Sequence, residues 1–418
     1  MSMAIPSLLA LFLQEPLTPV APVVPAPQMP NFAVAPAAVE ATRIALTPVL
    51  DGRLEEEEWD PFATEGSGKT YLQWEPGGLH LAAHVGPGYE IVASFDLAND
   101  GWLKGKDNLE LRIAPDGSVK ARIVDATPTS GPVWIDIPGF QLSTKVVAGP
   151  ETIEASIMDP GLGLLPEKTG SKIGVRVDLV PIGSAVMEAY MPRVATPVSL
   201  AFYRAAGLPT GLKFEPENES KSVVPGQTVR LRFTYSGKND MGLQRLNLRS
   251  EGPARMATSL IEVPFPTFDR KNRAFVDYDT PVASGASLGY RIARGSLTGA
   301  DGIPSVMQVS YRIADPADAQ LVLDRIPVAE TDRSMKRNYY LRSNSGRPVN
   351  GKMKIELPAP LRILNGNDRN VPLGTSRSRI RQGFELFVPG GASGTFPVTF
   401  RFNIEGREYV QTQYLTVG

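Results

Sequence analysis

Apolar and polar residues alternate along most of the chain after residue 42, and this period of two predicts β-strands. The clearest case is NLELRIAPDGSVKARIV (residues 108–124), where three apolar residues alternate with polar ones, Asp116 and Gly117 supply a turn, and the alternation resumes at Val119. SKIGVRVDLV (residues 171–180) shows the same pattern. Windows of twelve or more residues with a helical apolar stripe, free of glycine, proline and β-branched runs, do not occur. The sequence therefore predicts an all-β protein.

Three domains are predicted, at residues 42–206, 211–316 and 319–418. In the second region, a Pro-Gly turn at residues 225–226 precedes an alternating stretch that is typical of an early strand in immunoglobulin-like sandwiches. The third region repeats the order of the second, with a strand, a polar turn, a strand and then a proline-containing exit. We therefore expect three tandem β-sandwich domains, of which the second and third are immunoglobulin-like.

The N-terminal 41 residues differ from the rest of the chain. Residues 1–14 contain an apolar stretch of signal-peptide length, too short to span a bilayer, although no Lys or Arg precedes it. Residues 15–41 form a proline-rich linker, which favours an extended spacer. Later segments lack the roughly 18 consecutive apolar residues of a transmembrane helix. These features predict an exported protein that is secreted, periplasmic or held at the cell surface.

Composition excludes several classes of function. The 43 Lys and Arg residues balance 44 Asp and Glu residues, which gives no electrostatic attraction towards nucleic acid. The chain has no cysteine, so disulfides, thiolate nucleophiles and cysteine-based metal sites are absent. Thirty-nine glycines and 38 prolines favour many turns over long helices.

Sequence signals of catalysis are weak. The two histidines, His80 and His84, lie four residues apart on one predicted strand, about 13 Å from each other, so we expect surface positions rather than a shared metal. A Gly-x-Ser-x-Gly nucleophile motif is absent, and GSGK at residues 66–69 lacks the opening glycine of a phosphate-binding loop. We therefore predict that the protein is not an enzyme; a hydrolase with an unrecognised site is the alternative.

Four segments occur in the order found in one family. They are VLDGRLEEEEW (residues 49–59), YLQWEPGGLHLAAHV (71–85), GWLKGKDNLELRI (101–113) and the strand, loop and strand of residues 153–179. Together they make residues 42–205 resemble carbohydrate-binding module family 9, a β-sandwich group related to the DOMON-like domains. The other two domains look like the immunoglobulin-like sandwiches that accompany carbohydrate-active enzymes.

The resemblance implies roles for several aromatic residues. It places Trp59 and Trp74 in the core and leaves the glutamates before Trp59 as a solvated edge. In sugar-binding members of the family, the residues at the positions of Trp102 and Glu110 stack on the ligand and bind its hydroxyls. This chemistry is reasonable in itself, because an aromatic ring covers the C–H face of a sugar and a carboxylate accepts hydroxyl protons.

The family's second sugar-binding tryptophan has no counterpart near the end of the first domain. Tyr190 is one candidate to replace it. Trp134 is another, with an ordinary hairpin-core position as its alternative.

The loop DLANDGWLKGKD gathers oxygen ligands. Asp96, Asn99, Asp100 and Asp107 lie within this one loop, and calcium prefers such ligands. The spacing is not that of an EF-hand, so calcium is a candidate cofactor and an ordinary Asn-Asp-Gly turn is the alternative.

The sequence thus favours a non-catalytic, exported carbohydrate-binding protein that recognises a polysaccharide or oligosaccharide through its first sandwich. The alternative is a structural or adhesive surface protein that uses all three sandwiches for contacts with other cell-surface proteins. Nucleic acid is not a predicted partner.

Overall fold

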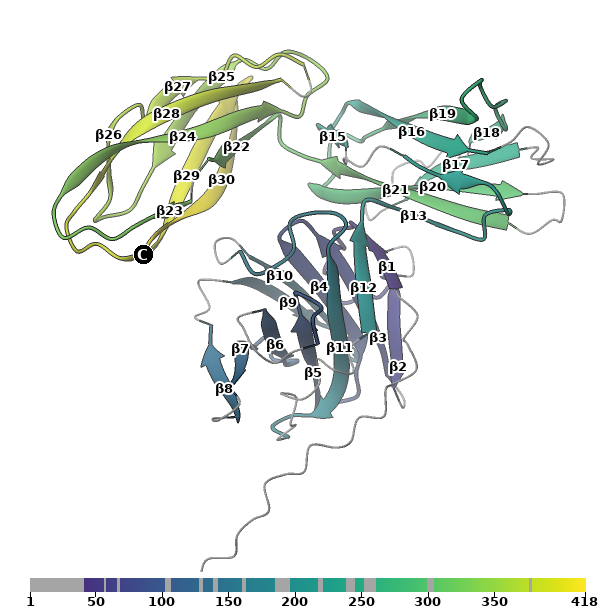
Figure 1. Ribbon diagram of the computed structural model, residues 1–418, viewed down its shortest axis with the longest axis horizontal. Helices are drawn as coiled ribbons and strands as arrows, with labels where there is room; N and C mark the ends of the chain where they lie inside the picture. The colour runs from purple at the N-terminus through teal and green to yellow at the C-terminus, as the bar shows by residue number, and fades with distance from the viewer. Residues whose placement is uncertain are drawn as a thin grey trace, which may run out of the picture. The chain divides into compact units, whose positions relative to one another are not determined.

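The computed structural model describes residues 41–418 with short gaps, and every element in this part is a β-strand (Figure 1). The residues that it does not describe are 1–40, 56–57, 66–67, 102–106, 128–130, 138–141, 160–162, 185–195, 217–220, 238–244, 252–260, 299–303, 323 and 376–377. The strands form six sheets in three pairs, and each pair encloses its own apolar core. The protein is therefore all-β and built from β-sandwiches, as predicted. The described residues contain no helix capable of crossing a membrane.

The first sandwich packs a seven-stranded sheet on a five-stranded one. Its strands are β1 (Ala41–Ile44), β2 (Pro61–Glu65), β3 (Gly68–Glu75), β4 (Gly78–His84), β5 (Tyr89–Asp96), β6 (Asn108–Ile113), β7 (Val119–Thr127), β8 (Gly131–Asp136), β9 (Ser143–Ala148), β10 (Thr152–Met158), β11 (Lys172–Pro181) and β12 (Thr196–Ala201). The sheet orders are β1-β12-β11-β5-β6-β7-β8 and β2-β3-β4-β10-β9. Neighbouring strands are antiparallel except for β1 and β12, which run parallel.

The second sandwich begins directly after β12. Its strands are β13 (Tyr203–Ala206), β14 (Lys213–Phe214), β15 (Lys221–Val223), β16 (Thr228–Ser236), β17 (Arg245–Glu251), β18 (Ile261–Pro264), β19 (Arg273–Pro281), β20 (Gly289–Thr298) and β21 (Pro304–Ile313). One sheet has the order β13-β21-β20-β17-β18, with β15 also on β21, and the other has the order β14-β16-β19. Residues 203–206, which were predicted to belong to the first domain, pair with β21.

The third sandwich contains the longest strands. They are β22 (Ala317–Leu321), β23 (Arg325–Ile326), β24 (Arg333–Ser343), β25 (Gly351–Glu356), β26 (Arg362–Asn365), β27 (Asp368–Asn370), β28 (Arg379–Val388), β29 (Gly394–Ile404) and β30 (Arg407–Val417). A four-stranded sheet, β22-β24-β28-β26, faces a five-stranded sheet, β23-β30-β29-β25-β27.

Strand β16 shows how the alternating pattern builds these sandwiches. The four apolar residues at odd positions between 229 and 235 are buried, and each contributes about 1.5–3 kcal/mol by leaving water. Arg230 and Arg232 face outwards and pair with Asp279 and Asp277 on β19, each at 2.7 Å. Side chains of the outer face therefore meet cross-strand partners of opposite charge.

A stack of three aromatic rings joins the first two sandwiches. Phe202, between β12 and β13, lies between Trp74 of β3 and Tyr290 of β20, with ring centroids 5.9 Å apart on each side. The ring planes are inclined by 22° and 9°, so both contacts are stacked. Because Trp74 is fully buried, the stack ties the core of the first sandwich to the second.

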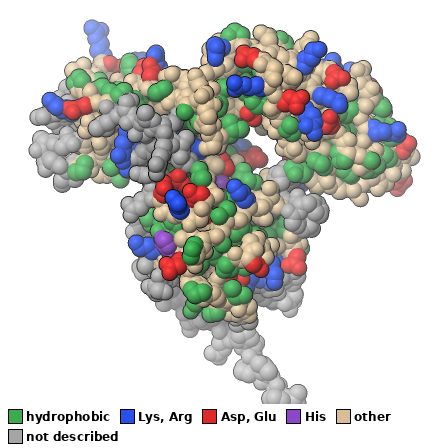
Figure 2. Space-filling model, turned by 180° about the vertical axis from the view of Figure 1, so that it is seen from behind, with side chains coloured by type: hydrophobic (Ala, Val, Ile, Leu, Met, Phe, Trp, Pro, Cys, Tyr) green, Lys and Arg blue, Asp and Glu red, His purple; other side chains and the backbone are tan. Residues whose placement is uncertain are grey.

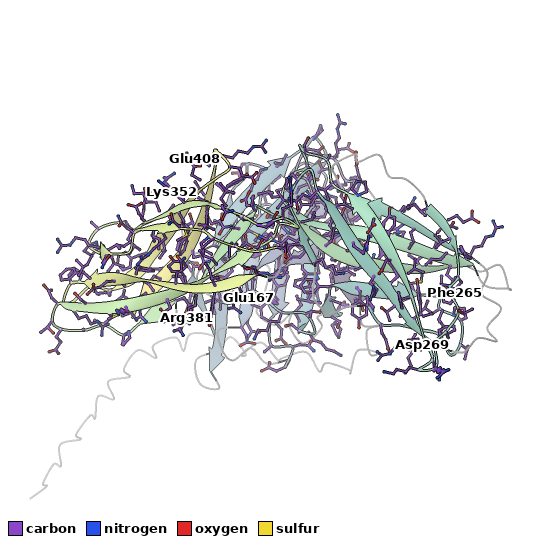
Figure 3. The ribbon with its side chains drawn as sticks, turned by 90° about the horizontal axis from the view of Figure 1, so that it is seen from above. Glu167, Phe265, Asp269, Lys352, Arg381 and Glu408 are labelled. Atoms are coloured by element: carbon purple, nitrogen blue, oxygen red, sulfur yellow. The ribbon has the colours of Figure 1, made fainter. Side chains whose placement is uncertain are left out.

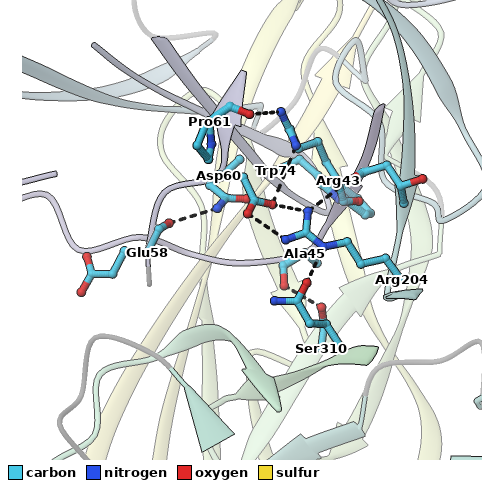
Figure 4. Close-up of polar contacts among 11 residues, drawn as sticks. Arg43, Ala45, Glu58, Asp60, Pro61, Trp74, Arg204 and Ser310 are labelled. Atoms are coloured by element: carbon cyan, nitrogen blue, oxygen red, sulfur yellow. Dashed lines mark hydrogen bonds and ion pairs between the residues drawn. The ribbon is translucent and has the colours of Figure 1, made fainter. Parts of the chain in front are cut away.

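Polar contacts surround this stack (Figure 4). Arg204 donates two hydrogen bonds to the carboxylate of Asp60, at 2.6 and 2.8 Å. Arg43 donates to the carbonyl oxygen of Pro61 at 2.6 Å, and burial lowers its pKa. The hydroxyl of Ser310 on β21 donates to the carbonyl oxygen of Ala45, which follows β1, at 2.7 Å. The contact between the first two sandwiches is therefore partly buried and includes the charge-assisted hydrogen bonds between Arg204 and Asp60.

The segment of residues 47–60 covers the outer face of the five-stranded sheet. Trp59 packs there against Tyr71 and Ala82 and is 1% exposed, which confirms the core positions predicted for Trp59 and Trp74. Its indole Nε1 donates to Glu154 on β10 at 3.2 Å, and the backbone nitrogen of Gly52 donates to the same carboxylate at 2.6 Å. Glu154 thus fixes this segment on the sheet.

Two surface predictions are wrong because this face is covered. Glu58, expected on a solvated edge, is 6% exposed, whereas Glu55 is exposed as expected. His80 is 1% exposed, with its Nε2 atom 3.2 Å from a carboxylate oxygen of Glu75, whereas His84 is exposed. The alternation placed His80 on the side of β4 away from the core correctly, but it carries no information about what covers that side.

The buried position of Glu58 predicts a pH-dependent stability. Burial, and then the nearby carboxylates of Glu55, Asp51 and Glu154, raise the pKa of Glu58 from 4.5 to about 7. Because the folded-state pKa is the higher one, the stabilising contribution is complete below about pH 4.5 and is lost as the pH rises through 7. Between pH 4.5 and 7, the free energy of unfolding of the parent should fall by on the order of 2 kcal/mol relative to that of Glu58→Gln. Denaturant unfolding at each pH measures this difference.

Glu405→Gln, at an exposed position of the third sandwich, is the control and should follow the parent. A difference between the parent and Glu58→Gln that stays constant from pH 4.5 to 7.5 would contradict the assignment.

Candidate functional site

The outer face of the seven-stranded sheet carries polar side chains that are nevertheless buried. The apolar residues of β6 enter the core, so Asn108, Glu110 and Arg112 project from the opposite face. The neighbouring strand places Ser94 opposite Glu110 and Asp96 opposite Asn108. Exposed fractions are 5% for Ser94, 1% for Asp96, 1% for Asn108 and 2% for Glu110. Polar side chains are seldom buried to this degree, and those that are buried normally have hydrogen-bond partners.

The charge of Glu110 is balanced by arginines on two strands. Arg122 of β7 lies directly opposite Glu110 and donates to its Oε1 atom. The Nε atom of Arg112 lies 3.6 Å from the same oxygen. A carboxylate between two guanidinium groups keeps its orientation, because each arginine presents a planar set of donors.

Several atoms of this face have no hydrogen-bond partner among the described residues. They are Oγ of Ser94, both side-chain polar atoms of Asn108, and Oε2 of Glu110. The residues are cross-strand neighbours, so the unpartnered atoms form one group. Leaving a buried polar atom unsatisfied costs about 1–3 kcal/mol. The group is therefore complementary to something that supplies donors and acceptors together, such as a hydroxyl-bearing ligand.

Further ion pairs hold the surroundings of this group. Arg112 donates to Glu90 at 2.8 Å and to the carbonyl oxygen of Ser184 at 3.2 Å. On β11, Arg176 contacts both carboxylate oxygens of Asp178. Buried side chains that are themselves bonded have fewer rotamers available, which keeps the site preorganised.

Three carboxylates meet at one end of the face. Oxygen atoms of Asp96, Asp100 and Asp107 lie within 4.8 Å of one another. Asp96 accepts hydrogen bonds from the backbone nitrogens of Asp100 and Gly101 at 3.3 and 2.7 Å, and Asn99 occupies the turn with a positive φ of 53°. Burial, and then the charges of Asp100 and Asp96, raise the pKa of Asp107.

This carboxylate cluster fits a divalent cation. The Oδ2 atom of Asp107 is buried without a partner, and a cation would remove the repulsion among the three charges. Calcium therefore stays the candidate for Asp96, Asn99, Asp100 and Asp107.

The structure places some of the sequence-predicted sugar-binding residues and not others. Glu110 lies in the buried polar group. Trp102 and Tyr190 lie outside the described residues. Trp134 is on β8, opposite Val124, and its side chain is among those the structure does not describe. The predicted roles of these three aromatic residues stay predictions.

Sequence reasoning missed Ser94, Asn108, Arg112 and Arg122. The sequence pattern could have placed these residues together in part, because polar residues at every second position of a strand share one face. Local alternation could not reveal that this face is buried, or that Asn108 has no partner.

Comparisons with known proteins give distant similarities. The sequence matches no protein-family model and no curated protein. A carbohydrate binding module family 9 domain from Caldicellulosiruptor kristjanssonii in complex with cellotriose is 16% identical over 38% of this chain and 93% of the module, with a TM-score of 0.28. Native E. coli alpha-2-macroglobulin is 10% identical over 90% of this chain and 32% of its own, with a TM-score of 0.24.

Fibronectin(III)-like modules of Clostridium thermocellum CbhA are 10% identical over 49% of this chain and 93% of theirs, with a TM-score of 0.17. The fold assignment therefore rests on the strand pairing of the chain itself.

The carboxylate cluster predicts a calcium-dependent gain in stability. At a calcium concentration about a hundredfold above Kd, the free energy of unfolding of the full chain should rise by about 2.7 kcal/mol, and the Tm should rise with it. Asp107→Asn should abolish most of that gain, whereas Asp324→Asn, at an exposed position of the third sandwich, should leave it intact. Thermal melting with and without calcium checks this, and an equal Tm in both conditions would exclude the site.

Proposed function

We propose that the first sandwich is a non-catalytic carbohydrate-binding domain and that the outer face of its seven-stranded sheet is the binding site. The observation that carries this proposal is the group of buried, unpartnered atoms on Ser94, Asn108 and Glu110. The resemblance of residues 42–205 to carbohydrate-binding modules, found in the sequence, points to the same face.

The chemistry of the group matches sugar hydroxyls. Each hydroxyl donates one hydrogen bond and accepts others, and neighbouring hydroxyls on a sugar ring lie within reach of adjacent side chains. Asn108 offers a donor and an acceptor, Oε2 of Glu110 an acceptor, and Ser94 either. Arg112 and Arg122 hold the carboxylate of Glu110 in place, so that Oε2 is an acceptor of fixed position.

An aromatic platform would complete the site. Amide, hydroxyl and carboxylate groups bind the rim of a sugar ring, and an aromatic side chain covers its apolar face. Trp102 precedes β6 by six residues and is our candidate for this role, with Trp134 and Tyr190 as further candidates.

We further propose that the chain is exported and acts outside the cytoplasm. Support comes from the apolar N-terminal stretch and the proline-rich linker that follows it. The second and third sandwiches then serve as a support for the binding domain.

This proposal is tested by titration calorimetry of the full chain against soluble oligosaccharides and polysaccharides in the presence of calcium. Asn108→Ala and Glu110→Gln should each weaken binding by about 10- to 100-fold, the equivalent of losing about 1.5–3 kcal/mol of hydrogen bonding. Trp102→Ala should weaken binding to a similar or greater degree. Circular dichroism and Tm verify that each variant is folded.

Asn403→Ala, at an exposed position of the third sandwich, is the matched control and should bind as the parent does. If glycan binding persists unchanged in the Asn108 and Glu110 variants, the site is misplaced. If the parent binds no glycan, the proposed function is wrong, and the structural or adhesive alternative takes its place.

A further inference from the structure

Three arginines share one face of the third sandwich. Strands β24 and β28 pair so that Arg342 lies opposite Arg379 and Tyr340 lies opposite Arg381. Leu341, between Tyr340 and Arg342, is buried in the core, so these four side chains lie on the outer face. All three arginines are exposed, and Arg381 is labelled in Figure 3. We call this set the arginine face.

Arg342 and Arg379 place like charges directly opposite each other, an arrangement that a few other cross-strand pairs share, such as Arg249 and Arg294. Such a cross-strand pair is destabilising, whereas opposite charges in the same geometry are stabilising. On β16, Arg230 and Arg232 face Asp279 and Asp277. On the outer face of β24 itself, Lys336 lies opposite a glutamate of β28. Figure 2 shows acidic and basic side chains interspersed over the face that it displays.

Within the described part of the chain, none of the three arginines forms an ion pair. The nearest carboxylate by register is Asp318 on β22, which lies opposite Arg342. That carboxylate is already engaged, because Arg312 donates to it at 2.7 Å and Gln411 at 2.8 Å. The positive charge of the arginine face is therefore not neutralised within the described structure.

Tyr340 orients one of the three guanidinium groups. The Cζ atom of Arg379 lies 3.5 Å from the centre of the Tyr340 ring, which is a close cation–π contact. A guanidinium group held flat on a ring keeps its N–H edges free, and those edges match two oxygens of a carboxylate or sulfate. With the ring covered by Arg379, Tyr340 is a poor platform for stacking a nucleobase.

The arginine face borders a cavity of about 960 Å³ with a mixed lining. Tyr340, Arg342 and Arg379 line it together with Arg312. Its lining also includes four acidic residues, which are Glu75, Glu167, Asp315 and Asp318. Carboxylates would repel a bare polyanion but accept hydrogen bonds from hydroxyls. The lining suits a ligand that carries hydroxyl groups beside its oxyanions.

We propose that the arginine face binds the oxyanion groups of an acidic polysaccharide, carboxylate or sulfate, at a site separate from the one on the first sandwich. Arg342 and Arg379 form the centre of the site and Arg381 extends it along β28. The acidic side chains of the cavity take the hydroxyls of the same ligand. This inference does not depend on the proposed function of the first sandwich.

The proposal is tested by affinity electrophoresis of the full chain in gels that contain polygalacturonate, dextran sulfate or neutral dextran. Polygalacturonate carries carboxylates and dextran sulfate carries sulfates, so these two polymers distinguish the two oxyanions. The parent should be retarded by at least one acidic polymer and not by neutral dextran. Arg342→Gln combined with Arg379→Gln should weaken this binding at least tenfold, with a Tm equal to or above that of the parent because a like-charge pair is removed. The paired variant Arg230→Gln with Arg232→Gln, which removes equal charge from the second sandwich, is the matched control.

Three results would overturn the proposal. They are no retardation of the parent by either acidic polymer, an equal loss of binding in the control pair, and equally tight binding of duplex DNA, which would indicate a non-specific polyanion surface. Asn108→Ala should leave acidic-polymer binding intact, so failure of this inference and failure of the proposed function give different results.

Discussion

The burial of a charged and polar sheet face is the constraint on which the first sandwich depends. A sandwich sheet normally buries one apolar face and leaves the other to water, but here Asn108 and Glu110 are about as buried as Leu109 between them. The sheet tolerates this because Arg112 and Arg122 neutralise Glu110. The remaining unpartnered atoms are concentrated at one place, which is what a binding site for a polar ligand requires.

A second constraint fixes how the first sandwich is supported. Phe202 follows β12 immediately and precedes β13, so the chain passes from one sandwich to the next without a linker. Its ring lies between Trp74 and Tyr290, and the Arg204–Asp60 pair closes the same contact. Since these groups are buried or half-buried, the first two sandwiches are joined by specific packing.

Much of the architecture could be predicted from the sequence because strand alternation is local. The apolar residues at 109, 111 and 113 and the tryptophans at 59 and 74 enter the core as expected. Which outer face becomes covered depends on distant segments. The sequence therefore misplaced Glu58 and His80, which are 6% and 1% exposed. For the same reason, Glu110 could be named but its unpartnered neighbour Asn108 could not.

The most direct test of the central claim is a crystal structure of the full chain with a bound oligosaccharide. The account predicts sugar hydroxyls within hydrogen-bonding distance, about 2.6–3.2 Å, of the Asn108 amide and of Oε2 of Glu110. A sugar bound elsewhere on the first sandwich, with Ser94, Asn108 and Glu110 satisfied by other protein groups, would contradict it.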